Sequence, residues 1–528
     1  MMTVRSEPGT AAEAVQGSGR MSHAEVIQAL SGLMLGLFVT ILASTIVSNA
    51  LPRIIADLGG TQSVYTWVVT TELLSMTATV PLWGKMADLY SRKLLIQLSL
   101  SLFVVGSLIA GFAPNVTLLL VSRIAQGVGA GGMGALAMIV MAAMIPPREL
   151  GKYSGLFGAV FGAGTIAGPL IGGVLVDTDW LGWRWCFLIG IPFSLAAIAL
   201  LQKTLHLPVA RRDVTIDWLG AFLIMAGVCT LLVWSTLAGQ HFAWGSWQTA
   251  AFVIAGAALI GLAVRTEARA AEPIVPLGLF RNRTVTLAVV ASTLVGVAMF
   301  GGTVFLSQYF QISLGKSPTV AGLMSLPMIG GVLVSSTAAG QLITRYGRWK
   351  AYLVAGSIVM TVGFLLLSTI DARTGAGLLA LYMVILGAGV GMLMQNLVLA
   401  AQNDVPAASL GAATSVLTFF RSMGGAIGVS ALGAILADRV TSLFADRFGA
   451  AAAGGGKVPD LATLPPPVLA VIRDIYGQAT SDLFLVAAPI AFLAVLAVLF
   501  IKEKPLSRLT GDERRAREEA AVATAEEL

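Results

Sequence analysis

Charged side chains are scarce in this sequence. Asp, Glu, Lys and Arg together make up 11% of its 528 residues, whereas 56% of the residues are hydrophobic. A water-soluble protein carries about 25% charged residues, because its surface faces water. The shortage therefore excludes an ordinary soluble protein and indicates a polytopic membrane protein, which exposes much of its surface to lipid.

Cysteine and histidine are also nearly absent. Cys186 and Cys229 lie in or beside apolar runs, with no spacing typical of a disulfide framework or a metal site. The three histidines, His23, His206 and His241, are scattered and lie outside the apolar runs. These shortages argue against a metal centre, and we expect the cysteines to be small packing residues.

No apolar core typical of a cleaved signal peptide precedes the first long apolar run. Residues 1–24 are polar, and we expect the span that begins near Val26 to be an uncleaved insertion signal. A helix needs about 20 apolar residues to cross the hydrocarbon core. By this measure fourteen spans are predicted, near 26–51, 64–83, 94–112, 117–144, 151–176, 184–202, 217–239, 249–265, 285–310, 319–343, 350–370, 376–401, 412–436 and 482–501.

The net charge of +6 would suggest nucleic-acid binding in a soluble protein. Here Lys and Arg concentrate in alternate loops and in the tails, as the positive-inside rule predicts for cytoplasmic segments. An even number of spans places both termini on one side, which we expect to be the cytoplasm. The basic loops and the lack of organelle signals favour the plasma (inner) membrane of a bacterium, with no nucleic-acid partner.

Two loop sequences resemble each other. "GKMADLYSRK" follows the second span at 84–93, and "GQLITRYGRWK" follows the tenth at 340–350. The match predicts two related six-helix bundles with two helices inserted between them, as in transporters that alternate access. The predicted domains are a cytoplasmic tail at 1–24, a bundle at 25–202, inserted helices 7 and 8 at 203–283, a bundle at 284–501 that includes an outer loop at 437–481, and a cytoplasmic tail at 502–528, either helical or disordered.

The fifth span carries a run of small residues, "GAGTIAGPLIGG", at 162–173. Gly164, Gly168, Gly172 and Gly173 recur at helical spacing and let another helix approach closely. Pro169 removes one backbone hydrogen bond and permits a bend. Taken alone, the run is also typical of an ordinary packing seam between membrane helices.

Together with other segments, this run resembles the major facilitator superfamily. G-x-x-x-G-P-x-x-G-G is similar to that family's antiporter motif, and 84–93 to its loop between spans 2 and 3. Residues 123–134 are similar to the family's fourth-span motif with a buried arginine, and residues 42–54, 183–193 and 419–428 resemble segments of its fourteen-span drug:proton antiporter branch. The resemblance implies an all-α fold with fourteen transmembrane helices. It also implies that the protein exports hydrophobic or amphipathic molecules, that a proton gradient drives this export, and that no cofactor takes part.

Two positions depart from the pattern of that branch. Ala43 stands where the first span usually has an aspartate, and Ser91 stands where the loop motif has a glycine. A proton-coupled carrier needs a group that titrates inside the membrane, so the missing aspartate requires a substitute. Ser91 is a smaller change, because the turn can accept serine.

Glu72 is the predicted substitute for the missing acid. At about 1.5 Å per residue, Glu72 lies roughly 12 Å deep in the second span and Arg123 roughly 9 Å deep in the fourth. An ionised carboxylate at such a depth is costly unless it is paired, hydrated or protonated. We expect Glu72 to meet Arg123 and to bind and release a proton in each cycle; a static pair, or a carboxylate that faces an aqueous vestibule, is the alternative.

Asp88 lies in the loop after the second span and resembles the family's gating acid. The resemblance implies that its carboxylate caps a helix end and pairs with basic residues, here Arg92 and Lys93; a solvated loop is the alternative. Arg421 in span 13 matches a family position and is expected to pair within the second bundle or to neutralise a helix end.

Sparse polar and aromatic residues inside the spans are candidates for a substrate cavity, because polar side chains of membrane helices turn toward the bundle interior. Methionines nearby add adaptable apolar surface, which suits bulky amphipathic compounds better than sugars. For each residue alone, helix packing is the competing explanation. The candidates are Asn49, Gln126, Gln308, Tyr309, Gln395 and Asn396, with Met133, Met392 and Met394.

The sequence therefore predicts a monomeric, proton-coupled antiporter for multidrug or antibiotic efflux, and not an enzyme. A lipid, a siderophore or an endogenous metabolite is the alternative cargo on the same fold. A membrane-embedded lipid-modifying enzyme is the remote alternative. Asp177 and Asp179 lie near an outer turn, but no His, Cys or nucleotide-binding loop accompanies them.

Overall fold

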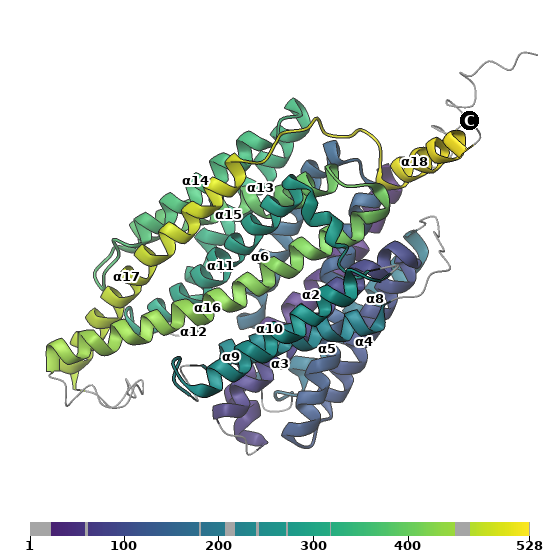
Figure 1. The fold of residues 1–528 in the computed structure, drawn as a ribbon. Helices are drawn as coiled ribbons and strands as arrows, with labels where there is room; N and C mark the ends of the chain where they lie inside the picture. The colour runs from purple at the N-terminus through teal and green to yellow at the C-terminus, as the bar shows by residue number, and fades with distance from the viewer. Residues whose placement is uncertain are drawn as a thin grey trace, which may run out of the picture.

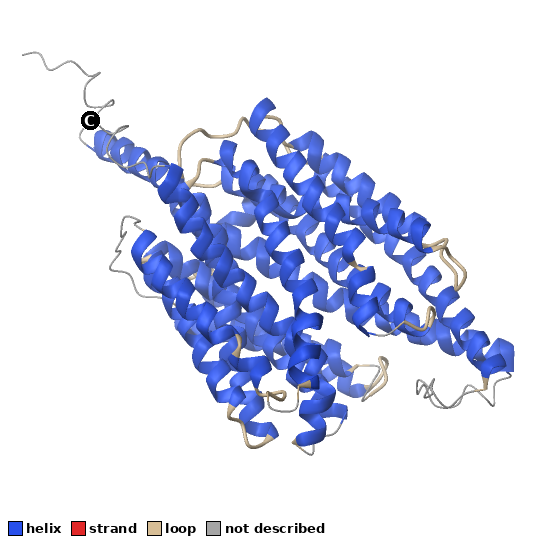
Figure 2. Ribbon diagram, turned by 180° about the vertical axis from the view of Figure 1, so that it is seen from behind, coloured by secondary structure: helices blue, strands red, loops and turns tan. Residues whose placement is uncertain are grey.

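The protein is built from helices joined by short connections (Figures 1 and 2). The structure, a computed structural model, describes residues 23–58, 62–178, 181–205, 217–238, 242–270, 273–316, 318–448 and 465–526. Its helices are α2 (His23–Asp57), α3 (Gln62–Leu89), α4 (Arg92–Gly111), α5 (Val116–Met144), α6 (Pro147–Asp177), α7 (Trp185–Leu188), α8 (Gly190–Thr204), α9 (Trp218–Leu237), α10 (Trp247–Glu267), η1 (Leu277–Arg281), α11 (Arg283–Ile312), α12 (Pro318–Met324), α13 (Leu326–Tyr346), α14 (Lys350–Leu367), α15 (Ala376–Asn403), η2 (Ala407–Ser409), α16 (Leu410–Phe448), α17 (Pro466–Leu499) and α18 (Gly511–Glu526).

Eleven helices in the described part of the chain are long and apolar enough to cross a membrane. They correspond to eleven of the fourteen predicted spans; the other three predicted spans coincide with α3, α6 and α9. The apolar stretches of α6 and α9 are shorter, at Leu156–Gly172 and Trp218–Trp234. The all-helical membrane fold is confirmed, and the count of fourteen spans stays a prediction.

The helices pack in two groups. In the first group α2 packs on α6 and α8, and α5 packs on α3 and α4. In the second group α11 packs on α16 and α17, and α15 packs on α13 and α14. The two groups meet where α6 lies against α13 and where α3 lies against α16. The predicted domain boundaries stay predictions.

The inserted helices α9 and α10 pack against each other, and α9 also contacts α3 and α16. Their outer faces are apolar and exposed, with Trp247 76%, Ile254 68% and Trp218 62% accessible. Large apolar side chains exposed over whole helix faces are typical of contact with lipid.

One end of the molecule carries α18, and we refer to it as the tail end (Figure 1). Gly511, the first residue of α18, lies beside Ala142 and Ala143 at the end of α5 and beside Leu410 at the start of α16. The tail predicted as a helix or a disordered segment is therefore helical over Gly511–Glu526.

Within the outer loop predicted at 437–481, the described residues 437–448 and 466–481 are helical, which corrects the sequence interpretation. α16 continues to Phe448 and α17 begins at Pro466. Ion pairs join the two extensions, with Arg439 Nε 2.6 Å from Asp482 Oδ2 and Arg447 Nη2 3.1 Å from Asp474 Oδ2. Hydropathy decreases where a helix leaves the lipid, whether or not the helix continues. The hydropathy of the sequence therefore could not show that α16 and α17 extend beyond their apolar spans.

The two repeated loops have different backbone conformations at one equivalent position. Gly347 ends α13 with φ +72°, a left-handed conformation that favours glycine. Ser91, at the equivalent position before α4, has φ −59°, which any residue adopts. Serine therefore costs no backbone strain in the first loop, as the sequence analysis expected.

Candidate functional site

Glu72 and Arg123 form a buried ion pair between α3 and α5. Nη2 of Arg123 donates to Oε2 of Glu72, and the two residues are 1% and 5% exposed, respectively. Gly127 and Gly131 of α5 allow this contact, because a Cβ at either position would clash with the backbone carbonyl of Glu72 or Met76. The predicted proximity of Glu72 and Arg123 is confirmed; proton transfer at Glu72 is not tested by the geometry.

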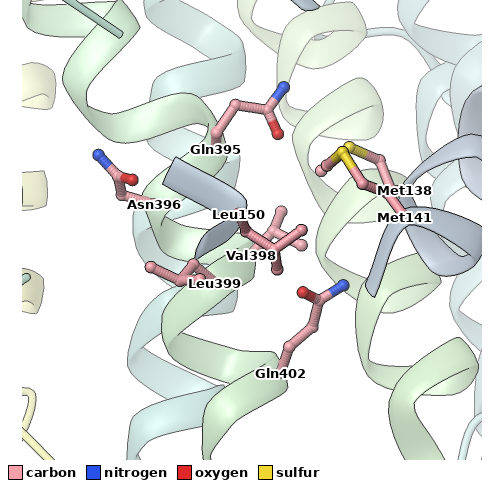
Figure 3. Close-up of a pocket in the computed structure, with 8 residues that line it drawn as sticks. All are labelled: Met138, Met141, Leu150, Gln395, Asn396, Val398, Leu399 and Gln402. Carbon is pink, nitrogen blue, oxygen red and sulfur yellow. The ribbon is translucent and has the colours of Figure 1, made fainter. Parts of the chain in front are cut away.

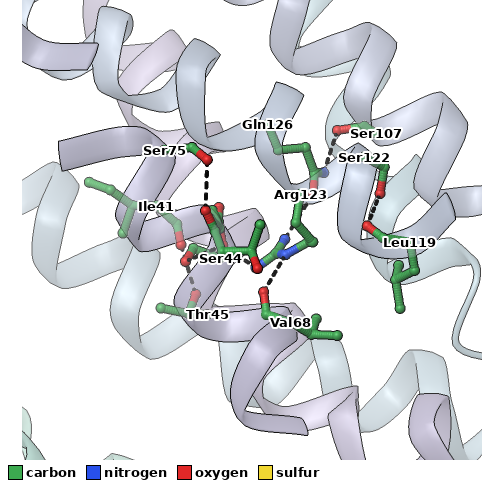
Figure 4. Close-up of polar contacts among 12 residues, drawn as sticks. Ile41, Ser44, Thr45, Val68, Ser75, Ser107, Leu119, Ser122, Arg123 and Gln126 are labelled. Carbon is green, nitrogen blue, oxygen red and sulfur yellow. Dashed lines mark hydrogen bonds and ion pairs between the residues drawn. The ribbon is translucent and has the colours of Figure 1, made fainter. Parts of the chain in front are cut away.

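Arg123 is held by further contacts that do not involve Glu72 (Figure 4). Its Nε donates to the Val68 carbonyl at 3.2 Å, and its Nη1 donates to Gln126 Oε1 at 2.8 Å. Gln126 Nε2 in turn donates to Ser107 Oγ of α4 at 2.9 Å. The guanidinium also lies 6.0 Å from the ring centroid of Phe187. These contacts fix the position of the cation independently of the carboxylate.

Helix α2 contributes a hydroxyl to the same carboxylate. Ser44 Oγ lies 3.4 Å from Glu72 Oε2, one residue after Ala43, where the family pattern has its aspartate. The structure thus places Glu72 beside the position of the missing acid. Serines and threonines in this region also bond their own helix, as Thr45 does to Ile41, so the sequence alone did not single out Ser44.

The glycine run of α6 packs on this part of α2. Gly164 lies against Ile41, Gly168 against Thr45 and Gly172 against Ile46. Thr45 Oγ1 also donates to the Gly164 carbonyl at 3.0 Å. The side-chain surroundings of Pro169 and Gly173 lie outside the described residues. The run is therefore a close helix contact next to the Glu72–Arg123 pair.

Asp88 joins the two bundles at the tail end. Its Oδ1 accepts from Gly411 N at 2.9 Å and its Oδ2 accepts from Ala412 N at 3.0 Å. Both amides lie in the first turn of α16, where backbone N–H groups lack helical partners. The prediction that Asp88 caps a helix end is confirmed, and the capped helix belongs to the opposite bundle.

Burial raises the pKa of Asp88 to about 6, although the amides of Ala412 and Gly411 and the charges of Arg92 and Lys85 oppose this shift. The charge of Arg92 therefore acts on Asp88, and the predicted pairing of the two residues stays a prediction. Lys93 does not pair with Asp88 in this structure; its Nζ donates to the Gln202 carbonyl of α8 at 2.6 Å.

Arg421 lies on α16 and donates to the Met394 carbonyl of α15 at 3.3 Å. This bond lies within the second bundle, one of the two arrangements expected for Arg421. The bond joins two neighbouring helices of that bundle and does not reach Glu72.

A small cavity lies between the bundles, near the tail end of α5, α6 and α15 (Figure 3). Its volume is about 20 Å³, enough for one water molecule. Gln395 and Asn396 are the two substrate candidates in its wall, and Oε1 of Gln395 is buried and has no hydrogen-bond partner among the described residues. The lining residues are Met138, Met141, Leu150, Gln395, Asn396, Val398, Leu399 and Gln402.

The other substrate candidates lie elsewhere. Gln126 belongs to the Arg123 network, and Tyr309 donates its hydroxyl to the Asp371 carbonyl at 2.6 Å. Gln308 is half-buried on α11, and the side chain of Asn49 lies outside the described residues. In the part of the chain that the structure describes, no group of three or more His, Cys, Asp or Glu side chains could hold a metal ion.

Comparison with known proteins gives the family. A profile of the Major Facilitator Superfamily matches residues 33–429. The Multidrug transporter protein MdtP of Bacillus subtilis is 36% identical over 455 residues, which are 86% of this chain and 81% of that protein. An uncharacterized MFS-type transporter of Mycobacterium tuberculosis is 37% identical over 514 residues, 96% of this chain and 74% of that protein.

The fold agrees with this result. The solved structure of the proton:xylose symporter XylE superposes with a TM-score of 0.61 over 94% of this chain and 100% of that chain. At 14% identity this likeness concerns the fold alone. The chain therefore belongs to the major facilitator superfamily and is a multi-pass membrane transporter, not an enzyme.

Proposed function

We propose that this transporter is a proton-coupled antiporter that exports hydrophobic or amphipathic small molecules, as in multidrug or antibiotic efflux. It operates as a monomer in a bacterial plasma membrane, with both termini and the tail end in the cytoplasm. The name of the Bacillus subtilis relative, a multidrug transporter, supports this class of cargo.

The observation that carries the proposal is the buried Glu72 carboxylate. It lies between three helices, on α3 beside Ser44 of α2 and Arg123 of α5. A carboxylate in such a place is stabilised by the neighbouring cation and destabilised by burial, so its proton affinity changes with its surroundings. Intramembrane acids of this kind are typical of proton pathways.

Protonation changes one contact of this network and leaves the others in place. A neutral Glu72 loses its charge attraction to Arg123, whereas Arg123 keeps its bonds to Val68 and Gln126. The cation stays bonded to the Val68 carbonyl of α3, and the neutral carboxyl of Glu72 is free to turn toward Ser44 of α2. Because α6 packs on α2 through Gly164 and Gly168, a shift of α2 reaches the glycine run directly.

Substrate binding requires the two bundles to separate. The cavity of about 20 Å³ between them holds no more than one water molecule. Gly84 and Gly411 bring α3 and α16 into backbone contact at the tail end, with Asp88 across the joint. Opening this joint exposes Gln395 and the methionines to the cytoplasm, which is the loading step of alternating access.

The test is transport of a cationic dye into proteoliposomes, with and without an imposed pH gradient, for the wild type and Glu72→Gln. The wild type should accumulate dye only with the gradient. Glutamine keeps the size of the side chain and an acceptor for Arg123, but it cannot exchange a proton. We expect the gradient-driven component to fall at least about tenfold in this variant.

Glu519→Gln is the matched control, because Glu519 is an exposed carboxylate on α18, far from the membrane interior. It should transport as the wild type does. Gradient-dependent transport that survives intact in Glu72→Gln would rule out Glu72 as the coupling group.

A further inference from the structure

Two acidic side chains meet at the tail end of the inserted helices, away from Glu72. Asp217 caps the start of α9, with Oδ1 accepting from Gly220 N at 2.8 Å. Glu267 is the last residue of α10, and its Oε2 accepts from Val275 N at 3.0 Å. Each carboxylate thus uses one oxygen to bind a backbone amide.

The second oxygen of each carboxylate has no such partner. Oδ2 of Asp217 and Oε1 of Glu267 are both buried and accept no hydrogen bond from the described residues. Both oxygens lie directly beside Gly220, because a Cβ at that glycine would clash with each of them. Glu267 is only 4% exposed. The two unpartnered oxygens therefore face the same small space.

A buried apolar cluster borders the pair. Leu89 at the end of α3, Ala221 of α9 and Ile274 form a buried apolar cluster at this joint, with Met86 and Val275 packed against it. Two ionised carboxylates at close range in such a place repel each other, and each keeps a buried acceptor without a donor. A single proton between them supplies the missing donor and removes one of the two charges.

We propose that Asp217 and Glu267 form a proton-binding site in which one carboxylic acid donates an O–H···O hydrogen bond to the other carboxylate. The proton comes from water at the tail end, and the pair retains one negative charge. The site does not depend on the transport function proposed above. It makes the docking of the inserted helices on α3 sensitive to pH.

A metal ion is the competing occupant. Lys85 of α3 acts electrostatically on Glu267, and its positive charge opposes a second cation in the same space. No third acidic, His or Cys ligand completes a metal site among the described residues. A proton needs only the two oxygens that are present. The charged groups that act on Glu267 are Asp217 and Lys85.

The sign of the pH effect follows from proton binding. At neutral pH the folded protein holds a proton that two separated carboxyls of the unfolded chain would release, so the folded state binds more protons. Stability is then highest at low pH and falls as the pH rises through the titration of the pair. We expect the melting temperature of the purified full chain to fall by about 2–4 °C across this titration.

The experiment records thermal unfolding in lipid nanodiscs from about pH 5 to about pH 9. Asp217→Asn and Glu267→Gln each place a permanent N–H donor where the shared proton lies. Each single variant should therefore lose the part of the decrease that the pair contributes and keep the part due to Asp88. Glu519→Gln, an exposed control, should keep the whole decrease.

Infrared difference spectra between the two pH limits give a second readout that does not depend on unfolding. The wild type should show a carboxylic-acid carbonyl band at low pH that disappears at high pH, and both single variants should lack this component. A wild type with neither the melting decrease nor the band would overturn the proposal. The proposal also fails if sodium or potassium chloride, but not choline chloride, restores the melting temperature at high pH, because a metal ion would then occupy the site.

Discussion

At the residue scale, Glu72 and Arg123 are unequal partners. Arg123 keeps bonds to Val68 and Gln126 when the carboxylate is removed, whereas among the described residues Glu72 keeps only the long contact with Ser44. Removing the cation therefore leaves a buried acid with little to stabilise its charge. A buried charge whose partner is deleted costs about 3 kcal/mol, unless the group takes up a proton.

We expect Arg123→Ala to lower the stability of the purified protein by about 3 kcal/mol, and Glu72→Gln to lower it less, by about 1 kcal/mol. In the double variant the buried acid is gone, so the loss should be at least about 1 kcal/mol smaller than the two single losses combined. Denaturant unfolding of the four proteins in detergent measures this coupling. Additive losses would show that the pair contributes no interaction energy.

Asp88 gives the tail-end joint a pH dependence. Its pKa is about 6 when buried against α16, compared with an ordinary value of 3.8. When the bundles part, the carboxylate meets water and its pKa falls, so a proton binds more tightly to the closed joint. Lowering the pH from about 7 to about 5 should therefore increase the closed population.

Spin labels at Tyr90 and Tyr346, the equivalent exposed positions of the two loops, report this joint by electron–electron distance measurement. Cys186 and Cys229 are replaced by serine so that only the labels react. The short-distance fraction should rise on acidification in the wild type and should not change in Asp88→Asn. The same pH response in both proteins would assign the effect to another group.

Some of these residues could be predicted from the sequence and others could not, for a physical reason. The depth of Glu72 and Arg123 along two spans predicted their contact, because an intramembrane charge has few possible partners. Ser44 and Ser107 could not be predicted. A serine in a membrane helix can bond its own backbone, as Ser122 does to Leu119, or reach a neighbouring helix, and spacing does not distinguish these cases.

At the scale of the elements, the glycine run of α6 works through close contact with α2. A Cβ at Gly168 would clash with the side chain of Thr45 and press on its backbone, whereas Gly134 of α5 has open space beside it. We expect Gly168→Ala to lower the stability by about 1–3 kcal/mol through overpacking. Gly134→Ala, the matched control, should leave it unchanged or raise it by up to about 1 kcal/mol through helix propensity.

The stabilities of the two glycine variants are compared by thermal unfolding, followed with a thiol-reactive dye that fluoresces when buried cysteines become exposed. The transport assay with a cationic dye then shows whether activity decreases together with stability. Equal effects of Gly168→Ala and Gly134→Ala would contradict a special contact at the run. The glycine run could be recognised in the sequence. Its partner helix could not, because glycine spacing predicts a close helix contact but does not identify the second helix.

Helix ends were the least predictable elements. The composition of 437–481 predicted a loop, yet α16 and α17 extend into it and are joined by Arg439 and Asp482. Hydropathy measures where lipid ends, and a helix continues beyond that point when its polar turns find partners. The inserted helices α9 and α10, apolar on their outer faces, followed the prediction closely.

At the scale of the whole molecule, the sequence could predict two bundles but not which end of them is closed. Conformations of a transporter differ by a few kcal/mol, and the same sequence must support each of them. The closed tail end depends on individual contacts, among them the backbone approach of Gly84 to Gly411 and the cap that Asp88 makes on α16. Neither contact leaves a periodic pattern in the sequence.

Helix α18 touches both bundles at this end, and its contacts are of two kinds. Arg514 donates to the carbonyls of Gln402 at 3.0 Å and Val405 at 2.5 Å, and Glu518 accepts from Ala407 N at 3.1 Å. All of these hydrogen bonds go to the second bundle, so they persist when the bundles part. The packing of α18 on the end of α5, which includes Gly511, has to break.

Two variants should therefore distinguish the hydrogen bonds that hold α18 on the second bundle from the contact of α18 with α5 that exists only in the closed form. Arg514→Ala removes hydrogen bonds that both conformations share, so it should lower the melting temperature by about 2–4 °C and leave the distance between labels at Tyr90 and Tyr346 unchanged. Gly511→Val places side-chain atoms against the Ala142 carbonyl of α5 and against Leu410. Gly511→Val should shift the distribution of distances between the labels toward the open form, because the contact with Ala142 of α5 exists only in the closed form. If Arg514→Ala opens the joint as much as Gly511→Val does, then the hydrogen bonds of α18 must themselves differ between the two conformations, and α18 must move with the first bundle.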